Sequence, residues 1–245
     1  MPKTPEEPVA EPAEEPGKGS VRYLWILRHG KAASDAPWGG GDRERPLTAR
    51  GRRDATALGN RLAEERPVLG LEGVRRPDLA ICSSAVRTRQ TARLIAKAFS
   101  EGLPLDSYRS LYDADTGVVL RYVREIDDSL KSALVVGHNP TMYELVWELL
   151  AGGVGGDDLA GGGGGGGGTD GAGGGGGTDG TGEADGDGET DGDDGDGDRP
   201  GNDRAALEAH GFPTCALAVL SLPVDGWEDV VRGCASLRGV FKPPY

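Results

Sequence analysis

The sequence predicts a three-layer α/β/α sandwich around a central, mostly parallel sheet. Two observations lead to this prediction. Short apolar runs typical of buried strands alternate along the chain with longer segments of helical periodicity, which is the order of an α/β domain. Several of the apolar runs end in turns that carry glycine, histidine or serine, and in open α/β sheets ligands bind beyond such strand ends. The 245 residues are enough for one sizeable domain.

The charge of the chain is distributed unevenly. The formal net charge is -13, but residues 152–203 alone carry 14 Asp and Glu and one Arg, which leaves 26 acidic and 26 basic residues elsewhere. The same segment holds 26 of the 43 glycines and can build no core. We therefore expect a disordered insertion at 152–203 within one domain that spans 21–245, after a disordered Pro- and Glu-rich tail at 1–20.

The composition argues against several classes of protein. No stripe of basic and aromatic residues indicates a nucleic-acid groove, no apolar run is long enough to span a membrane, and the first 20 residues lack the apolar centre of a secretory signal. Cys82, Cys215 and Cys234 are an odd number of cysteines without the paired spacing of a metal site, which favours reduced thiols. We expect a cytoplasmic protein without a nucleic-acid partner, a membrane partner, a metal or a cofactor.

Six apolar runs predict the strands of the sheet. A short run of this kind, bounded by polar, Gly or Pro residues, is typical of a strand. The predicted strands lie at 21–27, at 78–82, within 103–112, at 132–136, at 212–222 and at 228–237.

Four segments with helical periodicity separate these strands. Thr48 is a suitable N-cap for the first, a helix of about 18 residues whose arginines are expected to face solvent. Residues 31–46 come before it, and their Gly and Pro content predicts a loop that could contact a substrate. The other helices are predicted from about Val86 to Phe99, from about Asp115 to Ile126, and from Thr141 onward.

The strand ends carry the candidate chemistry. Arg28, His29 and Gly30 follow the first strand: arginine offers a fork of donors for phosphate oxygens, histidine can act as a nucleophile, and glycine leaves room for a ligand. Arg87 falls in the first turn of the second helix, where free backbone N–H groups and the helix dipole favour an anion. His138 follows the strand at 132–136, in the same kind of position as His29.

Three motifs in this order resemble those of the histidine phosphatase superfamily, which shares the phosphoglycerate-mutase fold. They are Arg28-His29-Gly30, the Ser-Ser-Ala-Val-Arg-Thr-Arg-Gln-Thr-Ala segment at residues 83–92, and Gly137-His138-Asn139-Pro140. The segments at 46–51 and 212–214 are similar to the small SixA-type branch of phosphohistidine phosphatases. The resemblance covers about residues 21–151 and 204–242.

The resemblance implies a metal-independent phosphatase. His29 would attack phosphorus and become a phosphohistidine, which water would then hydrolyse. Arg28 and Arg87 would clamp the phosphoryl oxygens, and His138, if protonated, would add a third cationic donor. The substrate site would comprise Arg28, Gly30, Arg87, His138 and Asn139.

The region that should supply a carboxylate general acid, residues 111–115, lacks the fuller pattern of larger family members. Asp113 and Asp115 are weak matches, and Asp115 is better placed as a helix cap. A missing acid matters least for a leaving imidazole that already carries a proton, so phosphohistidine in a protein is the predicted substrate. Two alternatives stay open: a phosphatase for a small phosphorylated molecule, and a non-catalytic phosphate-binding or scaffold protein.

Cys82 allows a different interpretation, which its spacing excludes. A cysteine phosphatase needs five residues between Cys and Arg, whereas four residues separate Cys82 from Arg87. We therefore expect Cys82 to be a small buried residue at a strand end.

Overall fold

The computed structural model describes residues 20–151 and 203–245. The predicted tail at 1–20 and the predicted insertion at 152–203 therefore lie outside the described residues, except for Ser20 and Asp203. All described residues belong to one structural unit.

A six-stranded sheet forms the centre of this unit, with the strand order β3-β2-β4-β1-β5-β6. β3, β2, β4 and β1 are parallel, while β5 runs antiparallel to β1 and β6 antiparallel to β5. The mostly parallel sheet confirms the predicted fold class. The strands are β1 (Val21–Arg28), β2 (Leu79–Ser83), β3 (Leu105–Tyr108), β4 (Ser132–Gly137), β5 (Leu217–Pro223) and β6 (Ser236–Phe241).

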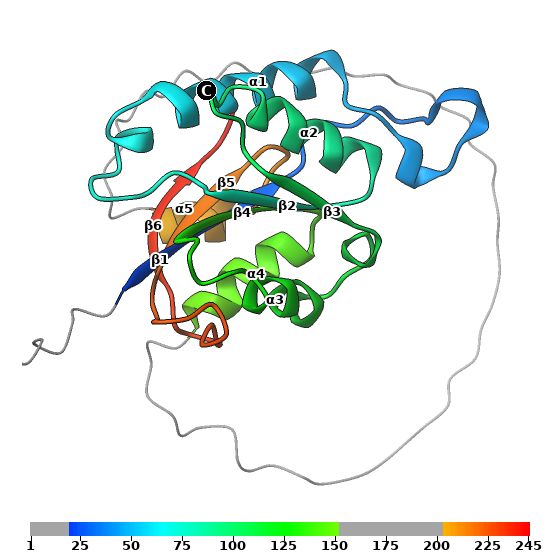
Figure 1. Ribbon diagram of the computed structural model, residues 1–245. Helices are drawn as coiled ribbons and strands as arrows, with labels where there is room; N and C mark the ends of the chain where they lie inside the picture. Colours follow the sequence, from blue (N-terminus) through cyan, green and yellow to red (C-terminus); the bar gives the residue numbers. More distant parts are fainter. Residues whose placement is uncertain (1–19, 152–202) are drawn as a thin grey trace, which may run out of the picture. The chain divides into compact units, whose positions relative to one another are not determined.

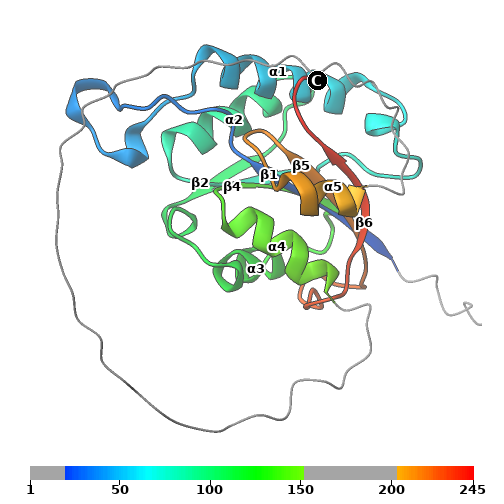
Figure 2. The same ribbon diagram turned by 180° about the vertical axis from the view of Figure 1, so that it is seen from behind.

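Helices cover both faces of the sheet and complete the three layers. In Figure 1, α1 and α2 lie on one face and α3 and α4 on the other, and Figure 2 shows α5 near β5 and β6. No helix in the described part of the chain has the length and apolar character needed to cross a membrane. The helices are α1 (Ala49–Glu64), α2 (Val86–Ala96), α3 (Thr116–Arg124), α4 (Thr141–Leu150) and α5 (Asp203–His210), with short 3-10 helices at Pro37–Gly39, Asp42–Glu44, Val68–Gly70 and Arg109–Leu111.

β1 shows why the sheet needs a layer on each side. Leu24 and Ile26 pack into the core shared with α3 and α4, while Trp25 and Leu27 pack into the core shared with α1 and α2. All four side chains are fully buried. Because successive side chains of a strand point to opposite faces, an uninterrupted apolar run must be covered on both.

The predicted helix starts agree with the caps in the structure. The Thr48 side chain accepts a hydrogen bond from Gly51 N at 3.0 Å, and Asp115 Oδ1 accepts one from Val118 N at 2.8 Å. Each satisfies an N–H group that has no partner within its helix.

The arginines of α1 face solvent as predicted: Arg50, Arg52 and Arg53 are exposed, and Arg61 pairs with Glu65.

Two predictions near the C-terminus are wrong. The strand predicted at 228–237 begins only at Ser236, because the residues before it form turns. Trp227 and Val230 reach the core from those turns, and Trp227 Nε1 donates a hydrogen bond to the Leu130 carbonyl oxygen at 2.8 Å. Apolar side chains that pack from an irregular segment imitate a strand in the sequence. The strand predicted at 212–222 also starts later, at Leu217, and α5 was not predicted.

The turn after β1 packs closely against the start of α1. A Cβ atom at Gly30 would lie 2.8 Å from the Gly51 carbonyl oxygen, and one at Gly51 would overlap the Lys31 carbonyl oxygen. Neither position can accept a side chain without a backbone shift. This contact fixes the turn that carries His29.

We expect Gly51→Ala to lower the free energy of unfolding by on the order of 2 kcal/mol, because the new methyl group forces two backbone segments apart. Urea denaturation would measure the loss. Gly117→Ala is the matched control: it also lies in the first turns of a helix, and its Cβ would meet only Asp115 Oδ1 at 3.4 Å. Equal stability of the two variants would contradict the close packing.

Candidate active site

Three neighbouring parallel strands end at the same edge of the sheet. β4 lies between β1 and β2, and its end carries His138. His29 follows β1 and Ser83 is the last residue of β2. The ring centroids of His29 and His138 are 5.1 Å apart. Segments that are far apart in the sequence thus place their polar residues together.

Hydrogen bonds define the protonation of His29. Its Nδ1 lies 2.8 Å from the Gly30 carbonyl oxygen, which can only accept, so Nδ1 carries the proton and Nε2 the lone pair. Arg87 Nε donates to this Nε2 at 3.3 Å. Burial, together with the nearby charges of Arg87, Arg28 and Arg45, lowers the pKa of His29 to about 4. At neutral pH the imidazole is therefore uncharged, with an unprotonated Nε2.

The backbone beside His29 is held by α2. Gly30 N donates to Thr91 Oγ1 at 3.0 Å, and Thr91 Oγ1 donates to the Arg87 carbonyl oxygen at 2.8 Å. Gly30 therefore fixes the turn, and its role in binding a substrate stays a prediction. This chain of bonds couples the position of His29 to the helix that carries Arg87.

Arg87 lies in the first turn of α2, as predicted, and is 8% exposed. Its Nη1 donates to the Asp42 carbonyl oxygen at 2.7 Å, and its Nη2 donates to Asp42 Oδ2 at 2.8 Å. Ala85 occupies the N-cap position and offers no side-chain cap, so the positive end of the helix adds to the charge of Arg87. A positive charge thus lies beside the His29 ring, and the Asp42 carboxylate pairs with it.

Asp42 is a charged residue of the site that sequence reasoning missed. Its carboxylate also accepts hydrogen bonds from Tyr112 Oη and Arg45 Nη1, each at 2.6 Å. The bond from Tyr112 and those from Arg87 and Arg45 hold the pKa of Asp42 well below its usual range. Residues 31–46 were predicted as a contact loop, but only its folded path brings Asp42 and Arg45 toward Arg87.

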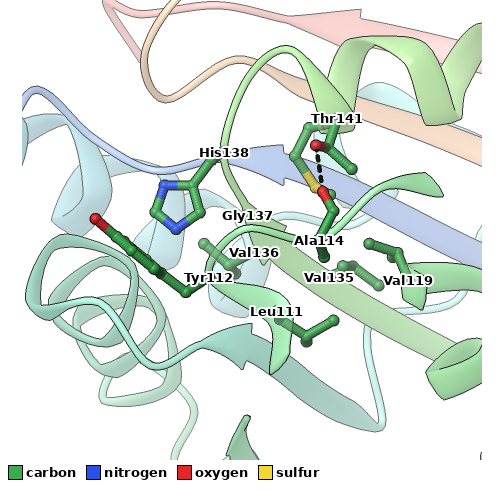
Figure 3. A pocket seen from close by; sticks show the side chains of 10 residues that line it. Leu111, Tyr112, Ala114, Val119, Val135, Val136, Gly137, His138 and Thr141 are labelled. Atoms are coloured by element: carbon green, nitrogen blue, oxygen red, sulfur yellow. Dashed lines mark hydrogen bonds between the residues drawn. The ribbon is translucent and has the colours of Figure 1, made fainter. Parts of the chain in front are cut away.

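The surroundings of His138 favour its neutral form. Its Nε2 is hydrogen-bonded to Ser83 Oγ at 2.9 Å, and its ring meets Tyr112 edge-on with centroids 5.6 Å apart (Figure 3). Burial, followed by the influence of His29 and Arg87, lowers the pKa of His138 to about 3. The third cation that the sequence analysis allowed would require a protonated His138, and these surroundings disfavour that form.

A narrow and largely apolar pocket adjoins His138 (Figure 3). Gly137 permits its close packing, because a Cβ atom there would lie 2.7 Å from Met142 Cε. The apolar surroundings disfavour the charged form of the imidazole. The pocket is lined by Leu111, Tyr112, Ala114, Val119, Val135, Val136, Gly137, His138, Thr141 and Met142.

Arg28 and Asn139 share one acceptor. Arg28 Nη1 donates to the Phe212 carbonyl oxygen at 2.9 Å, and Asn139 Nδ2 donates to the same oxygen at 2.8 Å. The two predicted substrate-binding residues therefore also anchor the segment before β5. Within the described residues, Arg28 Nε and Asn139 Oδ1 are buried without a hydrogen-bond partner. Their contact with a substrate stays a prediction.

The remaining predicted residues have structural positions. Cys82 is fully buried, as predicted, and burial raises its pKa to about 12. Asp115 caps α3 as expected, and Asp113 is exposed. In the part of the chain that the structure describes, no group of three or more His, Cys, Asp or Glu could hold a metal ion.

The fold and the site together define an α/β protein with two histidines and Arg87 gathered at one edge of the sheet. A family model described as the histidine phosphatase superfamily (branch 1) matches residues 24–144. This match, which runs from β1 into α4, confirms the resemblance noted in the motifs.

Sequence relatives from two mycobacteria cover different shares of the chain. An uncharacterized protein of Mycobacterium tuberculosis (strain H37Rv) is 28% identical over 217 residues, which cover 89% of this chain and 99% of that protein. An uncharacterized protein of Mycobacterium leprae is 28% identical over 116 residues, 47% of this chain and 65% of that protein.

Solved structures share the fold at lower identity. A protein assigned as the phosphohistidine phosphatase SixA of Nakamurella multipartitia matches with a TM-score of 0.57 and 22% identity, over 94% of this chain and 100% of that chain. A protein histidine phosphatase SixA complexed with tungstate matches with a TM-score of 0.53 and 19% identity, over 90% of this chain and 97% of that chain. These likenesses concern the three-layer fold.

The lowered pKa of His29 predicts a pH-dependent stability. Between about pH 6.5 and pH 4 the unfolded chain binds a proton at this residue and the folded chain does not, so stability falls as the pH falls through this window. Between pH 7 and pH 5 we expect the wild type to lose about 2 kcal/mol more unfolding free energy than His29→Gln. Urea denaturation at both pH values measures this difference, and equal losses would mean that His29 titrates normally.

Proposed function

We propose that this protein is a phosphatase that uses His29 as its nucleophile. The observation that carries the proposal is the unprotonated Nε2 of His29, which lies 3.3 Å from Arg87 Nε. A phosphorus atom in contact with this lone pair would have its oxygens within reach of the Arg87 guanidinium. Fixed positive charge at that place stabilises the charge that develops on a transferring phosphoryl group.

The proposed reaction has two displacements. In the first, a bond forms between His29 Nε2 and phosphorus while the bond from phosphorus to the leaving group breaks. In the second, water attacks the phosphohistidine, phosphate leaves and the lone pair returns to Nε2. Arg28 and Arg87 would hold the phosphoryl oxygens in both steps, and we expect the reaction to proceed in the presence of EDTA.

The acidic residues around the site support a phosphohistidine substrate. Asp42 is the carboxylate bonded to Arg87, and its low pKa keeps it ionised and unable to give a proton to a leaving group. Asp115 is committed to the cap of α3. An imidazole leaving group needs no such acid when it already carries a proton, whereas an alkoxide does. We therefore propose phosphohistidine in a protein as the substrate, as in the SixA proteins that share the fold.

A cytoplasmic location forms part of this proposal. Cys82, Cys215 and Cys234 are all free thiols, and Cys82 and Cys215 are buried. Free thiols are typical of proteins in a reducing compartment.

The first test is hydrolysis of an aryl phosphate with EDTA present. We expect turnover by the wild type and a loss of at least about a thousandfold in His29→Ala, because the covalent route is closed. An aryl leaving group is activated, so the lack of a general acid does not hide the activity. Wild type quenched with alkaline SDS should carry a phosphate label on His29, because the phosphorus–nitrogen bond of phosphohistidine survives in base and hydrolyses in acid.

Two results would contradict the proposal. Equal turnover in wild type and His29→Ala would remove His29 as the nucleophile. Absence of turnover in both, with tungstate still bound, would favour the non-catalytic phosphate-binding protein.

The substrate class needs a separate comparison. We expect kcat/KM for a phosphohistidine peptide to exceed that for the same peptide with phosphoserine by at least about a hundredfold, since one leaving group needs protonation and the other does not. Release of inorganic phosphate measures both reactions. A preference for sugar phosphates over both peptides would instead establish a small-molecule phosphatase.

A further inference from the structure

The ring nitrogens of His138 have different surroundings. Nε2 is hydrogen-bonded to Ser83 Oγ at 2.9 Å. Nδ1 is buried, and within the described residues it has no hydrogen-bond partner. Buried polar atoms are almost always paired, so an unpaired one in a ring whose centroid lies 5.1 Å from that of His29 needs an explanation.

The bonds of Ser83 decide which nitrogen of His138 carries the proton. Ser83 is fully buried, and its Oγ accepts a hydrogen bond from Ala85 N at 3.3 Å. Among the described residues, His138 Nε2 is the one atom bonded to Ser83 Oγ that can accept its proton. If Nε2 donated instead, both the hydroxyl proton and the Nδ1 lone pair would be left without a partner. Donation by Ser83 leaves one unpaired group, the Nδ1–H.

We propose that Ser83 is a positioning residue that keeps His138 in the neutral tautomer with the proton on Nδ1. His138 then donates an uncharged hydrogen bond from Nδ1 to an oxygen of the bound phosphoryl group. The second part of this inference rests on the proposed function, because it needs a phosphoryl group beside His29. The first part, the tautomer, does not depend on turnover.

The charges of the site explain why a neutral donor fits there. Arg87 lies beside His29 and interacts with the ring of Tyr112, which also contacts His138. A positive charge on His138 would be repelled by Arg87. A neutral N–H supplies the directional hydrogen bond without that cost, provided that another group holds the other nitrogen as an acceptor.

Nitrogen NMR of the full chain tests the tautomer directly. The chain has three histidines, so His138 can be assigned by comparison with His138→Gln. In wild type at pH 7, with and without tungstate, we expect a protonated Nδ1 and an unprotonated Nε2. In Ser83→Ala we expect the proton to move to Nε2, and tungstate to bind about tenfold more weakly, because a lone pair then faces the oxyanion.

Ser84→Ala is the matched control. Ser84 is the next residue, and within the described part of the chain its buried Oγ has no hydrogen-bond partner. This variant should keep the wild-type tautomer and bind tungstate within about twofold of wild type. Ser83→Thr, which retains a hydroxyl, should restore the wild-type tautomer.

The wild-type spectrum decides the inference even if Ser83→Ala does not fold. A proton on Nε2, or on both nitrogens of His138, would overturn it, as would an unchanged tautomer in a folded Ser83→Ala. The expected tautomers in a protein without aryl phosphatase turnover would support the role of Ser83 and reject the proposed function. If turnover depends on His29 but the proton of His138 lies on Nε2, the proposed function is supported and the role of Ser83 is rejected.

Discussion

The parallel pairing of β4 with β1 on one side and β2 on the other is the constraint on which the site depends. Val136 of β4 is in register with Leu27 of β1 and with Cys82 of β2. One or two residues later, the three strands deliver His29, Ser83 and His138 to one edge of the sheet. A shift of one residue in either pairing would turn the side chains to the opposite face. Alternate side chains of β1 and β4 are packed into two different cores, and this fit opposes such a shift.

Electrostatics determines what these residues can do once they are together. Burial and neighbouring arginines keep His29 and His138 uncharged, so a lone pair is present at His29 Nε2 at neutral pH. Arg87, which is almost fully buried, would be costly without a partner, and Asp42 supplies one. A phosphoryl group is also anionic and could take the place of that carboxylate on Arg87. The pocket is thus complementary to an anion even though its two histidines are neutral.

The accuracy of the sequence prediction follows the regularity of each segment. The strands expected at 21–27, 78–82 and 132–136 agree with β1, β2 and β4 within about one residue, because each is buried on both faces and therefore continuously apolar. The strand expected at 228–237 failed because Trp227 and Val230 reach the core from turns. Local apolar content reports burial, and only a regular spacing reports the backbone conformation.

The amino-acid sequence alone predicts the fold class and most helix and strand positions. It also singles out His29, Arg87 and His138, because strand-end motifs and helix caps are local signals. The tertiary structure decided which charges surround them. Asp42 and Arg45 enter the site through the folded path of an irregular loop, and no local pattern records that path. The tautomers of His29 and His138 likewise depend on the Gly30 carbonyl oxygen and the Ser83 hydroxyl, whose directions are set only when the strands pair.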